Sequence, residues 1–288
     1  MSLSATTKIA GIVGWPVAQS FSPQLHGFWL NEMRIDGAFV PLPVRREDFS
    51  VVIRALMKAG FTGVSVTIPH KEAAFAVAHD CDVAGRIAGA VNLLIFHQNG
   101  RIEGQNTDVA GLQTALGENP GAAAIAGKPV VILGAGGAAR AATIALHNLG
   151  AGEIRIVNRS PARADQLSMA LSAHIAPKIR VFDAAHWPEA AQHVALVVHA
   201  TSAGMKGLPS LDIALDPLPK MAAICDIVYN PLETPLLTRA RLAGFKTIDG
   251  LGMLMHQGVT AFQAFFGEKP KVTPQLRRYL EEALARDK

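Results

Sequence analysis

The sequence predicts an α/β fold divided into two domains, the second of which is built on a doubly wound parallel sheet. Three observations lead to this prediction. Short apolar runs alternate with helical patterns along most of the 288 residues. After a loop at 117–127 that is rich in Gly, Ala and Pro, the next strand candidate is fully apolar, which is typical of a central parallel strand. A glycine-rich turn then joins this apolar run, at 129–133, directly to a helical pattern.

In the first part of the chain, local patterns define each element in turn. We expect strands at 8–14, 38–42 and 61–68 and helices at 22–34 and 47–59. Ser22 fits the N-cap of the first helix, with Pro23 at its first helical position, and Gly60 ends the second helix. We also expect a hairpin over 90–106 with its turn at Gln98-Asn99-Gly100, and a helix at 107–116.

The second part continues the alternation and supplies the basis for the doubly wound sheet. The glycine-rich turn, a helix and a strand at 154–158 form a βαβ unit. Further strands are expected at 178–182, 194–200 and 222–228, and the C-terminal segment is mostly helical, at 251–266 and 273–286. Composition alone places one domain boundary near residue 120.

Composition and charge exclude several classes of protein. Half of the residues are hydrophobic and 17% are charged, so the chain can bury a substantial core. The net charge is +4, Lys and Arg do not gather into a stripe, and 6% of residues are aromatic, so we expect no nucleic-acid partner. Cys81 and Cys225 lie far apart, which argues against a disulfide framework and for a reducing compartment. Since neither a signal peptide nor a membrane span is indicated, we expect a cytoplasmic protein.

The glycine-rich turn has the pattern of a dinucleotide-binding loop. Its residues are Gly134, Ala135, Gly136, Gly137 and Ala138. Small residues allow a sharp turn, a close approach of backbone N–H groups to a pyrophosphate, and tight packing of the helix on the strand, while the helix N-terminus favours the anion. The alternative interpretation is a glycine-rich turn in a Rossmann-like fold that binds no cofactor.

The end of the next strand favours NADP over NAD. An NAD site carries an acidic residue there, which accepts hydrogen bonds from ribose hydroxyls. This chain instead has Asn158, Arg159 and Ser160, with Arg163 one helical turn further on. Two guanidinium groups suit a 2′-phosphate dianion. The alternative is a solvated helix start with two ordinary surface arginines.

Five polar residues in the first part lie at predicted strand ends or inside a predicted strand. Ser20 and Ser22 could both donate to a carboxylate, although Ser22 could instead serve only as a helix cap. Lys71 follows a strand that ends at a proline, and a lysine can carry acid–base chemistry, although a surface lysine is the commoner outcome. Asp108 lies at a strand-to-helix junction, where the alternative is a capping role. Asn92 lies in an apolar strand, so its amide must find partners.

Nine segments resemble, in order, the motifs of the shikimate dehydrogenase family, and together they span residues 14–257. They read GWPVAQSFSP, VTIPHK, GAVN, GQNTD, GAGGAAR, NRSPAR, HATSAG, DIVYNPLETPLL and GLGMLMHQ. The resemblance implies an NADP-dependent oxidoreductase that reduces 3-dehydroshikimate to shikimate in the biosynthesis of chorismate and aromatic amino acids. It also implies a substrate-binding domain of residues 1–108 with C-terminal helices from 250–288, a Rossmann-like NADP-binding domain of residues 109–249, and a monomer or homodimer.

The resemblance also implies a role for each motif residue. Lys71 and Asp108 would form the catalytic pair. The substrate carboxylate would be held by Ser20, Ser22 and Tyr229, and the ring hydroxyls by Thr67, Asn92 and Gln257. The cofactor would be held by residues 134–138, Asn158, Arg159, Arg163, Thr201, Gly250 and Met253. We expect no metal, because the histidines show no ligand spacing.

Three positions depart from the family pattern and leave alternatives open. Gln19 stands where the family often has His, Leu93 where it often has Thr, and Ser65 where it often has Asn. The first two put fine substrate specificity in doubt. A quinate or aminoshikimate dehydrogenase with relaxed cofactor or substrate choice is therefore one alternative. A non-catalytic sensor of shikimate-pathway metabolites is another, but it would be expected to lack Lys71 or Asp108.

Overall fold

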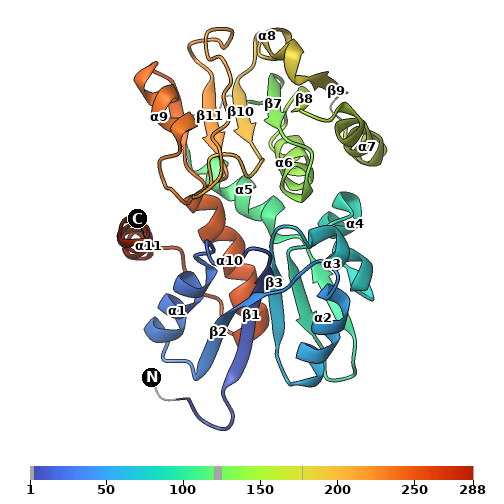
Figure 1. Ribbon diagram of the computed structural model, residues 1–288, viewed down its shortest axis with the longest axis vertical. Coiled ribbons are helices and arrows are strands. Elements are labelled where there is room, and N and C mark those ends of the chain that lie inside the picture. The colour runs from blue at the N-terminus through green and yellow to red at the C-terminus, as the bar shows by residue number, and fades with distance from the viewer. Residues whose placement is uncertain (1–2, 120–124, 177, 288) are drawn as a thin grey trace. The chain divides into compact units, whose positions relative to one another are not determined.

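The computed structural model describes residues 3–119, 125–176 and 178–287. The chain divides into two compact units, each with its own six-stranded sheet (Figure 1). Unit 1 contains residues 1–107 and 255–288, and unit 2 contains residues 108–254. The predicted class, two α/β domains with C-terminal helices that return to the first, is confirmed.

Unit 1 has a mixed sheet with the strand order β2-β1-β3-β5-β6-β4. Its strands are β1 (Lys8–Gly14), β2 (Gly37–Pro43), β3 (Gly63–Val66), β4 (Asp80–Cys81), β5 (Leu93–Phe96) and β6 (Ile102–Gln105). Strand β1 is parallel to β2 and β3, whereas β5 is antiparallel to both β3 and β6, as the predicted hairpin requires. Its N-terminal helices are α1 (Ser22–Glu32), α2 (Phe49–Lys58), α3 (Lys71–Val77) and α4 (Val83–Ala88).

Helix α11 (Pro274–Arg286) and most of α10 (Leu251–Phe266), from Met255 on, complete the described elements of unit 1 (Figure 1). The end of α10 packs on the sheet, where a Cβ on Gly63 would lie 2.7 Å from the ring of Phe265. Close approach to α1 depends on Gly258, where a Cβ would lie 2.5 Å from Leu25. The indole of Trp29 donates to the carbonyl of Lys271 at 3.1 Å and ties α1 to the segment before α11.

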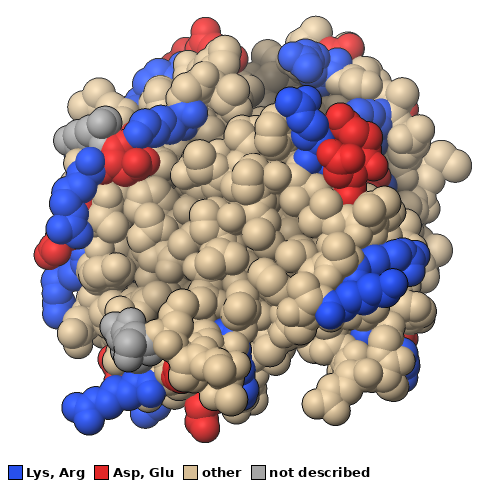
Figure 2. Space-filling view, turned by 60° about the horizontal axis from the view of Figure 1, so that its bottom comes forward, with Lys and Arg blue, Asp and Glu red and all other residues tan. Residues whose placement is uncertain are grey.

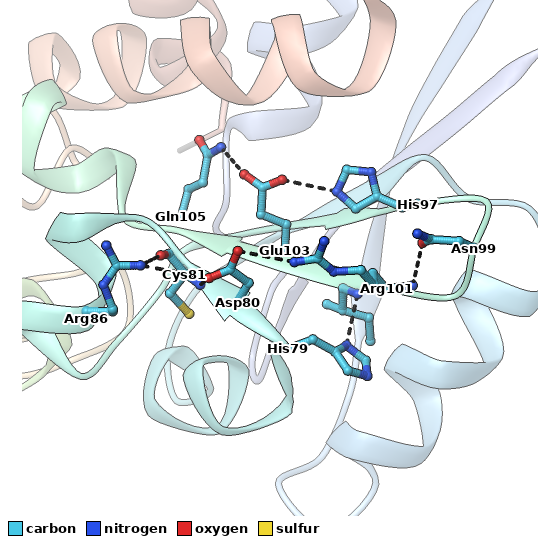
Figure 3. Close-up of polar contacts among 10 residues, drawn as sticks. His79, Asp80, Cys81, Arg86, His97, Asn99, Arg101, Glu103 and Gln105 are labelled. Atoms are coloured by element: carbon cyan, nitrogen blue, oxygen red, sulfur yellow. Dashed lines mark hydrogen bonds and ion pairs between the residues drawn. The ribbon is translucent and has the colours of Figure 1, made fainter.

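A network of exposed polar side chains links β4 to the β5–β6 hairpin (Figure 3). Arg101 and Arg86 lie 3.2 and 3.8 Å from the Asp80 carboxylate, and His97 lies 3.1 Å from the carboxylate of Glu103. Exposed pairs of this kind each contribute at most about 1 kcal/mol. Because β6 leads directly to the polar segment at 106–108, the network mainly holds that strand in register.

Unit 2 has a fully parallel sheet with the strand order β12-β11-β10-β7-β8-β9. Its strands are β7 (Pro129–Leu133), β8 (Glu153–Asn158), β9 (Lys178–Asp183), β10 (Leu196–His199), β11 (Ala223–Asp226) and β12 (Lys246–Ile248). The order runs outward in opposite directions from β7 and β10, so the sheet is doubly wound, with its switch point between these two strands. Ligands of such sheets bind beyond the carboxyl ends of the strands at this point.

The helices of unit 2 begin with α5, which starts at the unit boundary, and α6 to α9 pack on the sheet. They are α5 (Thr107–Gly117), α6 (Gly137–Asn148), α7 (Pro161–Ser172), the 3₁₀ turn η1 (Ala184–His186), α8 (Trp187–Ala190) and α9 (Pro235–Leu242). The core beneath α8 and α9 includes Val197, Ile224 and Trp187. The buried core fixes the strand ends on which the candidate site depends.

Several predicted boundaries differ from the structure. Ser22 is the first residue of α1 and not its N-cap, which is Phe21, and α1 ends at Glu32 before Arg34 adopts φ +54°. The strands predicted at 61–68, 194–200 and 222–228 are shorter at both ends. The loop predicted at 117–127 includes residues 120–124, which lie outside the described residues.

Membrane, metal and charge features can be stated for the part of the chain that the structure describes. None of its helices is both long and apolar enough to cross a membrane. It contains no group of three His, Cys, Asp or Glu side chains placed to hold a metal ion. Figure 2 shows one face on which Lys, Arg, Asp and Glu lie around the margin, with other residues across the centre. No stripe of one charge sign crosses that face.

Candidate active site

The loop after β7 has the geometry that a dinucleotide requires. Gly134 has φ +120°, and a Cβ there would lie 2.9 Å from Cγ2 of Thr201 and 3.0 Å from the carbonyl oxygen of Ala200, so only glycine fits. By contrast, a Cβ on Gly136 would meet no atom within 4 Å. Gly136 is the N-cap of α6 and gives its first N–H groups no side-chain cap. An uncrowded helix N-terminus of this kind suits a pyrophosphate.

The remaining loop residues keep the backbone accessible. Ala135 is buried, while Gly137 and Ala138 are half-buried at the start of α6. The backbone of Gly134 donates to the carbonyl of Val157 at 2.9 Å, which ties the loop to β8. The end of β8 therefore lies beside the loop.

At that end of β8, the side chains suit a phosphate better than ribose hydroxyls. The amide of Asn158 donates to the carbonyl of Ser160 at 2.9 Å and shapes the turn into α7. Arg159 and Arg163 are exposed, and neither side chain has a hydrogen bond or ion pair with another described residue. No carboxylate stands at the last position of β8. The fold and these residues fit a dinucleotide that carries an additional phosphate.

Unit 1 brings three of its polar side chains together. The amide of Asn92 donates to Oγ1 of Thr107 at 2.9 Å and to Oε1 of Gln257 at 3.2 Å, while its oxygen accepts from the backbone N–H of Thr107 at 2.7 Å. Thr107 Oγ1 and Gln257 Oε1 are 3.3 Å apart. Asn92 and Thr107 are buried, and Gln257 is half-buried. Amides and a hydroxyl that converge in this way can hold a polyhydroxylated ligand.

Lys71 and Thr67 each have one contact that places them in unit 1. The carbonyl of Lys71 accepts from the N–H of Val91, next to Asn92, at 3.0 Å. The methyl group of Thr67 packs on Gly14, where a Cβ would lie 2.5 Å away. The backbone of Lys71 therefore lies beside the segment that contains Asn92, and Thr67 lies beside the start of the loop that contains Ser20.

His70 anchors the start of α3, just before Lys71. Its Nε2 lies 2.8 Å from the carbonyl oxygen of Val44, and its ring stacks on Phe49 with the centroids 4.6 Å apart. Burial lowers the pKa of His70 below its ordinary value, so the buried ring is favoured in its neutral form. The helix that carries Lys71 thus has a fixed beginning.

The two serines lie next to each other. Ser20 Oγ and Ser22 Oγ are 3.3 Å apart, and both side chains are buried. The amide of Gln19 donates to the carbonyl of Pro16 at 2.9 Å and braces the same loop. Leu93, the other main departure from the family pattern, is fully buried, so any influence it has on a ligand is indirect.

The remaining predicted residues belong to unit 2. Asp108, its first residue, is buried and follows Thr107 directly. Tyr229 is half-buried beyond the end of β11. Met253 is buried near the start of α10, and Gly250 has a packing role, because a Cβ there would lie 2.2 Å from the carbonyl oxygen of Ile227. The pairings of Lys71 with Asp108 and of the serines with Tyr229 stay predictions.

Sequence reasoning did not single out four residues that the structure places at these sites. They are Thr107, His70, His199 and Asp226. Each makes its decisive contact with a residue distant in sequence, at 15 positions for Thr107 and Asn92 and at 27 for His199 and Asp226. For Thr107, the signal was its place in the GQNTD motif, which was interpreted through the adjacent Asp108. For His199, the signal was a histidine in a predicted apolar strand, where its ring nitrogens need polar partners.

Comparison with known proteins agrees with this description. The model of the shikimate dehydrogenase substrate binding domain matches residues 12–94, and that of shikimate/quinate 5-dehydrogenase matches residues 119–227. The shikimate dehydrogenase (NADP(+)) of Paramagnetospirillum magneticum is 45% identical over 96% of this chain and 99% of its own. That of Acidiphilium cryptum is 46% identical over 96% of this chain and 97% of its own.

Solved structures extend the comparison to three dimensions. A shikimate dehydrogenase in complex with NADP+ has a TM-score of 0.87 at 31% identity and covers 99% of this chain and 97% of its own. The Thermus thermophilus shikimate 5-dehydrogenase in complex with NADP(H) and shikimate has a TM-score of 0.81 at 32% identity, covering 97% and 99%. The fold and the site define a two-domain α/β protein with a Rossmann-type dinucleotide domain. More narrowly, the chain belongs to the shikimate dehydrogenase family.

Proposed function

We propose that this protein is an NADP-dependent shikimate dehydrogenase that reduces 3-dehydroshikimate to shikimate. One observation carries the proposal: over nearly its full length the chain is 45% identical to a protein with that enzymatic name. The polar cluster of unit 1 and the phosphate-favouring strand end of unit 2 support it, because they supply the two kinds of binding group that such a reaction needs.

Reduction of a ketone to an alcohol requires a hydride on carbon and a proton on oxygen. NADPH, when bound, supplies the hydride. Lys71, as an ammonium group, donates the proton to the ketone oxygen, and in the reverse direction its amine accepts the proton of the alcohol. Asp108 orients the Lys71 ammonium and accepts a hydrogen bond from the neighbouring hydroxyl group. The two side chains thus act as a pair.

Other side chains hold the substrate ring. Ring hydroxyl groups are bound by Thr67, Asn92 and Gln257, and Thr107 fixes the orientation of the Asn92 amide through the two contacts between these residues described above. Ser20 and Ser22 donate to the substrate carboxylate, together with the hydroxyl of Tyr229. Each of these assignments rests on the motif that contains the residue and on hydroxyl and amide groups suited to the ligand.

The cofactor is held by unit 2. Backbone N–H groups of the loop at residues 134–138 contact the pyrophosphate, and Arg159 and Arg163 bind the 2′-phosphate with Asn158 nearby. Thr201, Gly250 and Met253 contact the nicotinamide half of the cofactor. NADPH is therefore favoured over NADH.

The proposal is tested by following NADPH oxidation with 3-dehydroshikimate and NADP+ reduction with shikimate or quinate. Lys71→Ala is expected to lower kcat by at least about 10²-fold and to change the substrate KM little, because the lost group acts on a proton in transfer. Lys58→Ala, which removes an exposed lysine at the end of α2, is the matched control and should match wild type.

Three outcomes would contradict the proposal. A kcat near wild type for Lys71→Ala would remove that residue from the mechanism. Faster turnover of quinate than of shikimate would assign the protein to quinate, the named substrate of a dehydrogenase from Corynebacterium glutamicum that is 27% identical with a TM-score of 0.85. Tight binding of shikimate without any turnover would identify a metabolite sensor.

A further inference from the structure

A chain of buried hydrogen bonds ends at Thr201, beside the dinucleotide-binding loop. His199 Nδ1 lies 2.9 Å from Asp226 Oδ1, and His199 Nε2 lies 2.5 Å from the hydroxyl oxygen of Thr201. His199 and Asp226 are fully buried at the ends of β10 and β11, whereas Thr201 is half-buried. All three residues belong to unit 2.

Thr201 occupies the switch point of the parallel sheet. It follows β10, the strand next to β7, and the backbone of Ala200 donates to the carbonyl of Leu133 at 2.8 Å. Its methyl group lies where a Cβ on Gly134 would come within 2.9 Å. The Thr201 hydroxyl is therefore held against the loop that receives the dinucleotide.

At the other end of the hydrogen-bond chain, both carboxylate oxygens of Asp226 accept hydrogen bonds. Its Oδ2 accepts from the hydroxyl of Thr234 at 2.7 Å, and its Oδ1 accepts from the backbone N–H of Val228 at 3.0 Å as well as facing His199. A carboxylate with donors at both oxygens is an acceptor only. The proton between Asp226 and His199 therefore resides on Nδ1 of the imidazole.

We propose that His199 and Asp226 are positioning residues that make the Thr201 hydroxyl an acceptor, and not a donor, toward the bound dinucleotide. Nδ1 of His199 donates to Asp226, and Nε2 is assigned as the acceptor of the Thr201 hydroxyl proton. The same oxygen already accepts from the N–H of Ala203 at 3.1 Å. One lone pair is left for the ligand.

This assignment specifies which part of the cofactor Thr201 contacts. A hydroxyl whose proton is engaged repels a phosphate oxygen and attracts a donor. In the nicotinamide half of the dinucleotide, to which Thr201 is assigned above, the donors are the ribose hydroxyls and the carboxamide N–H₂ group. The inference rests on the proposed NADP site, and it assigns Thr201 to one of these donors and not to the pyrophosphate.

Binding of NADP+ by calorimetry tests the contact without any need for turnover. Thr201→Val removes the hydroxyl at constant shape and should raise the Kd about tenfold, while Thr201→Ser should restore it to within about twofold of wild type. Thr143→Val is the matched control, because the Thr143 hydroxyl is also buried but bonds to the carbonyl of Ala139 within α6. An unchanged Kd for Thr201→Val would overturn the contact.

The positioning role is tested by His199→Asn. Its amide can replace Nδ1 toward Asp226 but cannot reach Thr201, so the buried carboxylate keeps a donor and the fold is preserved. In this background Thr201→Val should raise the Kd by no more than about twofold, since the hydroxyl is no longer directed. A full tenfold effect in both backgrounds would show that His199 does not act through Thr201.

Nitrogen-15 NMR of the unliganded protein provides a readout that is independent of binding. The resonances that disappear in His199→Asn belong to His199, and they should have the shifts of a neutral ring protonated at Nδ1. Shifts of an imidazolium would overturn the proposal. Loss of all NADP+ binding in wild type would instead refute the proposed function, while the NMR result would still report on the chain itself.

Discussion

Acidification should destabilise this protein through one histidine in α1 that has no polar partner. His26 is fully buried, and neither ring nitrogen has a hydrogen-bond partner among the described residues. Its ring stacks on Phe39 with the centroids 3.9 Å apart and lies edge-on to Trp29 at 5.9 Å. Burial lowers the pKa of His26 from 6.5 to about 3, because a charged imidazole would lose its hydration without compensation.

The sign of the effect follows from the lowered pKa. Above pH 6.5 His26 is neutral in both states, and its contribution to stability is fully present. As the pH falls below 6.5, His26 binds a proton in the unfolded chain but stays neutral in the folded chain, so the free energy of unfolding falls. At pH 5.0 the loss is about 2 kcal/mol, because this pH lies roughly 1.5 pH units below 6.5 and each unit contributes about 1.36 kcal/mol. This magnitude holds for any folded-state pKa below about 4.

The measurement is urea unfolding of wild type and His26→Leu at pH 7.5 and pH 5.0. Each protein is compared with itself at the two pH values, so the change in packing caused by the substitution cancels. Wild type should lose about 2 kcal/mol more than His26→Leu over this interval. His174→Gln, which changes an exposed histidine, should lose as much as wild type.

The prediction depends on the neutral, buried ring. Equal losses of unfolding free energy for wild type and His26→Leu would show that His26 takes up its proton as readily in the folded state as in the unfolded one. Such a result would refute the burial argument, because a fully enclosed imidazolium among aromatic rings has no source of compensation.

The remaining predictions concern the cofactor loop and its neighbouring strand. Arg159→Ala should raise the KM for NADP+ about tenfold or more and leave that for NAD+ nearly unchanged, with Arg54→Ala as the control; equal effects on both cofactors would exclude contact with the 2′-phosphate. Gly134→Ala should destabilise the fold by about 1–3 kcal/mol because of its φ of +120° and its contact with Thr201, as measured by thermal unfolding. Gly136→Ala should cost less than about 0.5 kcal/mol of stability but lower NADP+ affinity about tenfold or more, and a Kd equal to wild type would place the pyrophosphate elsewhere.

The parts of the fold that the sequence predicted have local causes. The apolar strand at 129–133, the glycine turn and the helix after it are fixed by residues within one short stretch, and the structure confirms them as β7 and α6. The hairpin of β5 and β6 is likewise confirmed, since its turn places Gly100 at φ +81°. Strands β4 and β12 were missed because two or three residues are too few to show a period.

The predicted cap at Ser22 was wrong for a physical reason. Its hydroxyl lies 3.3 Å from that of Ser20, and the helix begins at Ser22 itself after Phe21. A serine before a proline is a good cap when it lies one residue outside the helix. Here the loop conformation that pairs the two serines shifts the helix start by one residue, and the local rule cannot include that pairing.

In the candidate site, most contacts depend on residues that are distant in sequence. The contact between Asn92 and Gln257 joins residues 165 positions apart, so it depends on the return of α10 to unit 1. The chain that runs from Asp226 to Thr201 depends on the parallel register of β10 with β11, which sets His199 opposite Asp226. Motif spacing can identify such residues individually, but the register of neighbouring strands determines which of them are in contact.

The glycines of the motifs illustrate how far a pattern can be interpreted. Gly134 and Gly250 are both explained by the protein alone, because a Cβ at either position would collide with neighbouring atoms of unit 2. Gly136 has no such explanation, since its Cβ would point into open space and its φ of −93° suits any residue. Glycine there brings the folded chain no packing advantage. What it gives instead is an unobstructed approach to the first N–H groups of α6, and that is of use only to a ligand that comes into contact with the backbone.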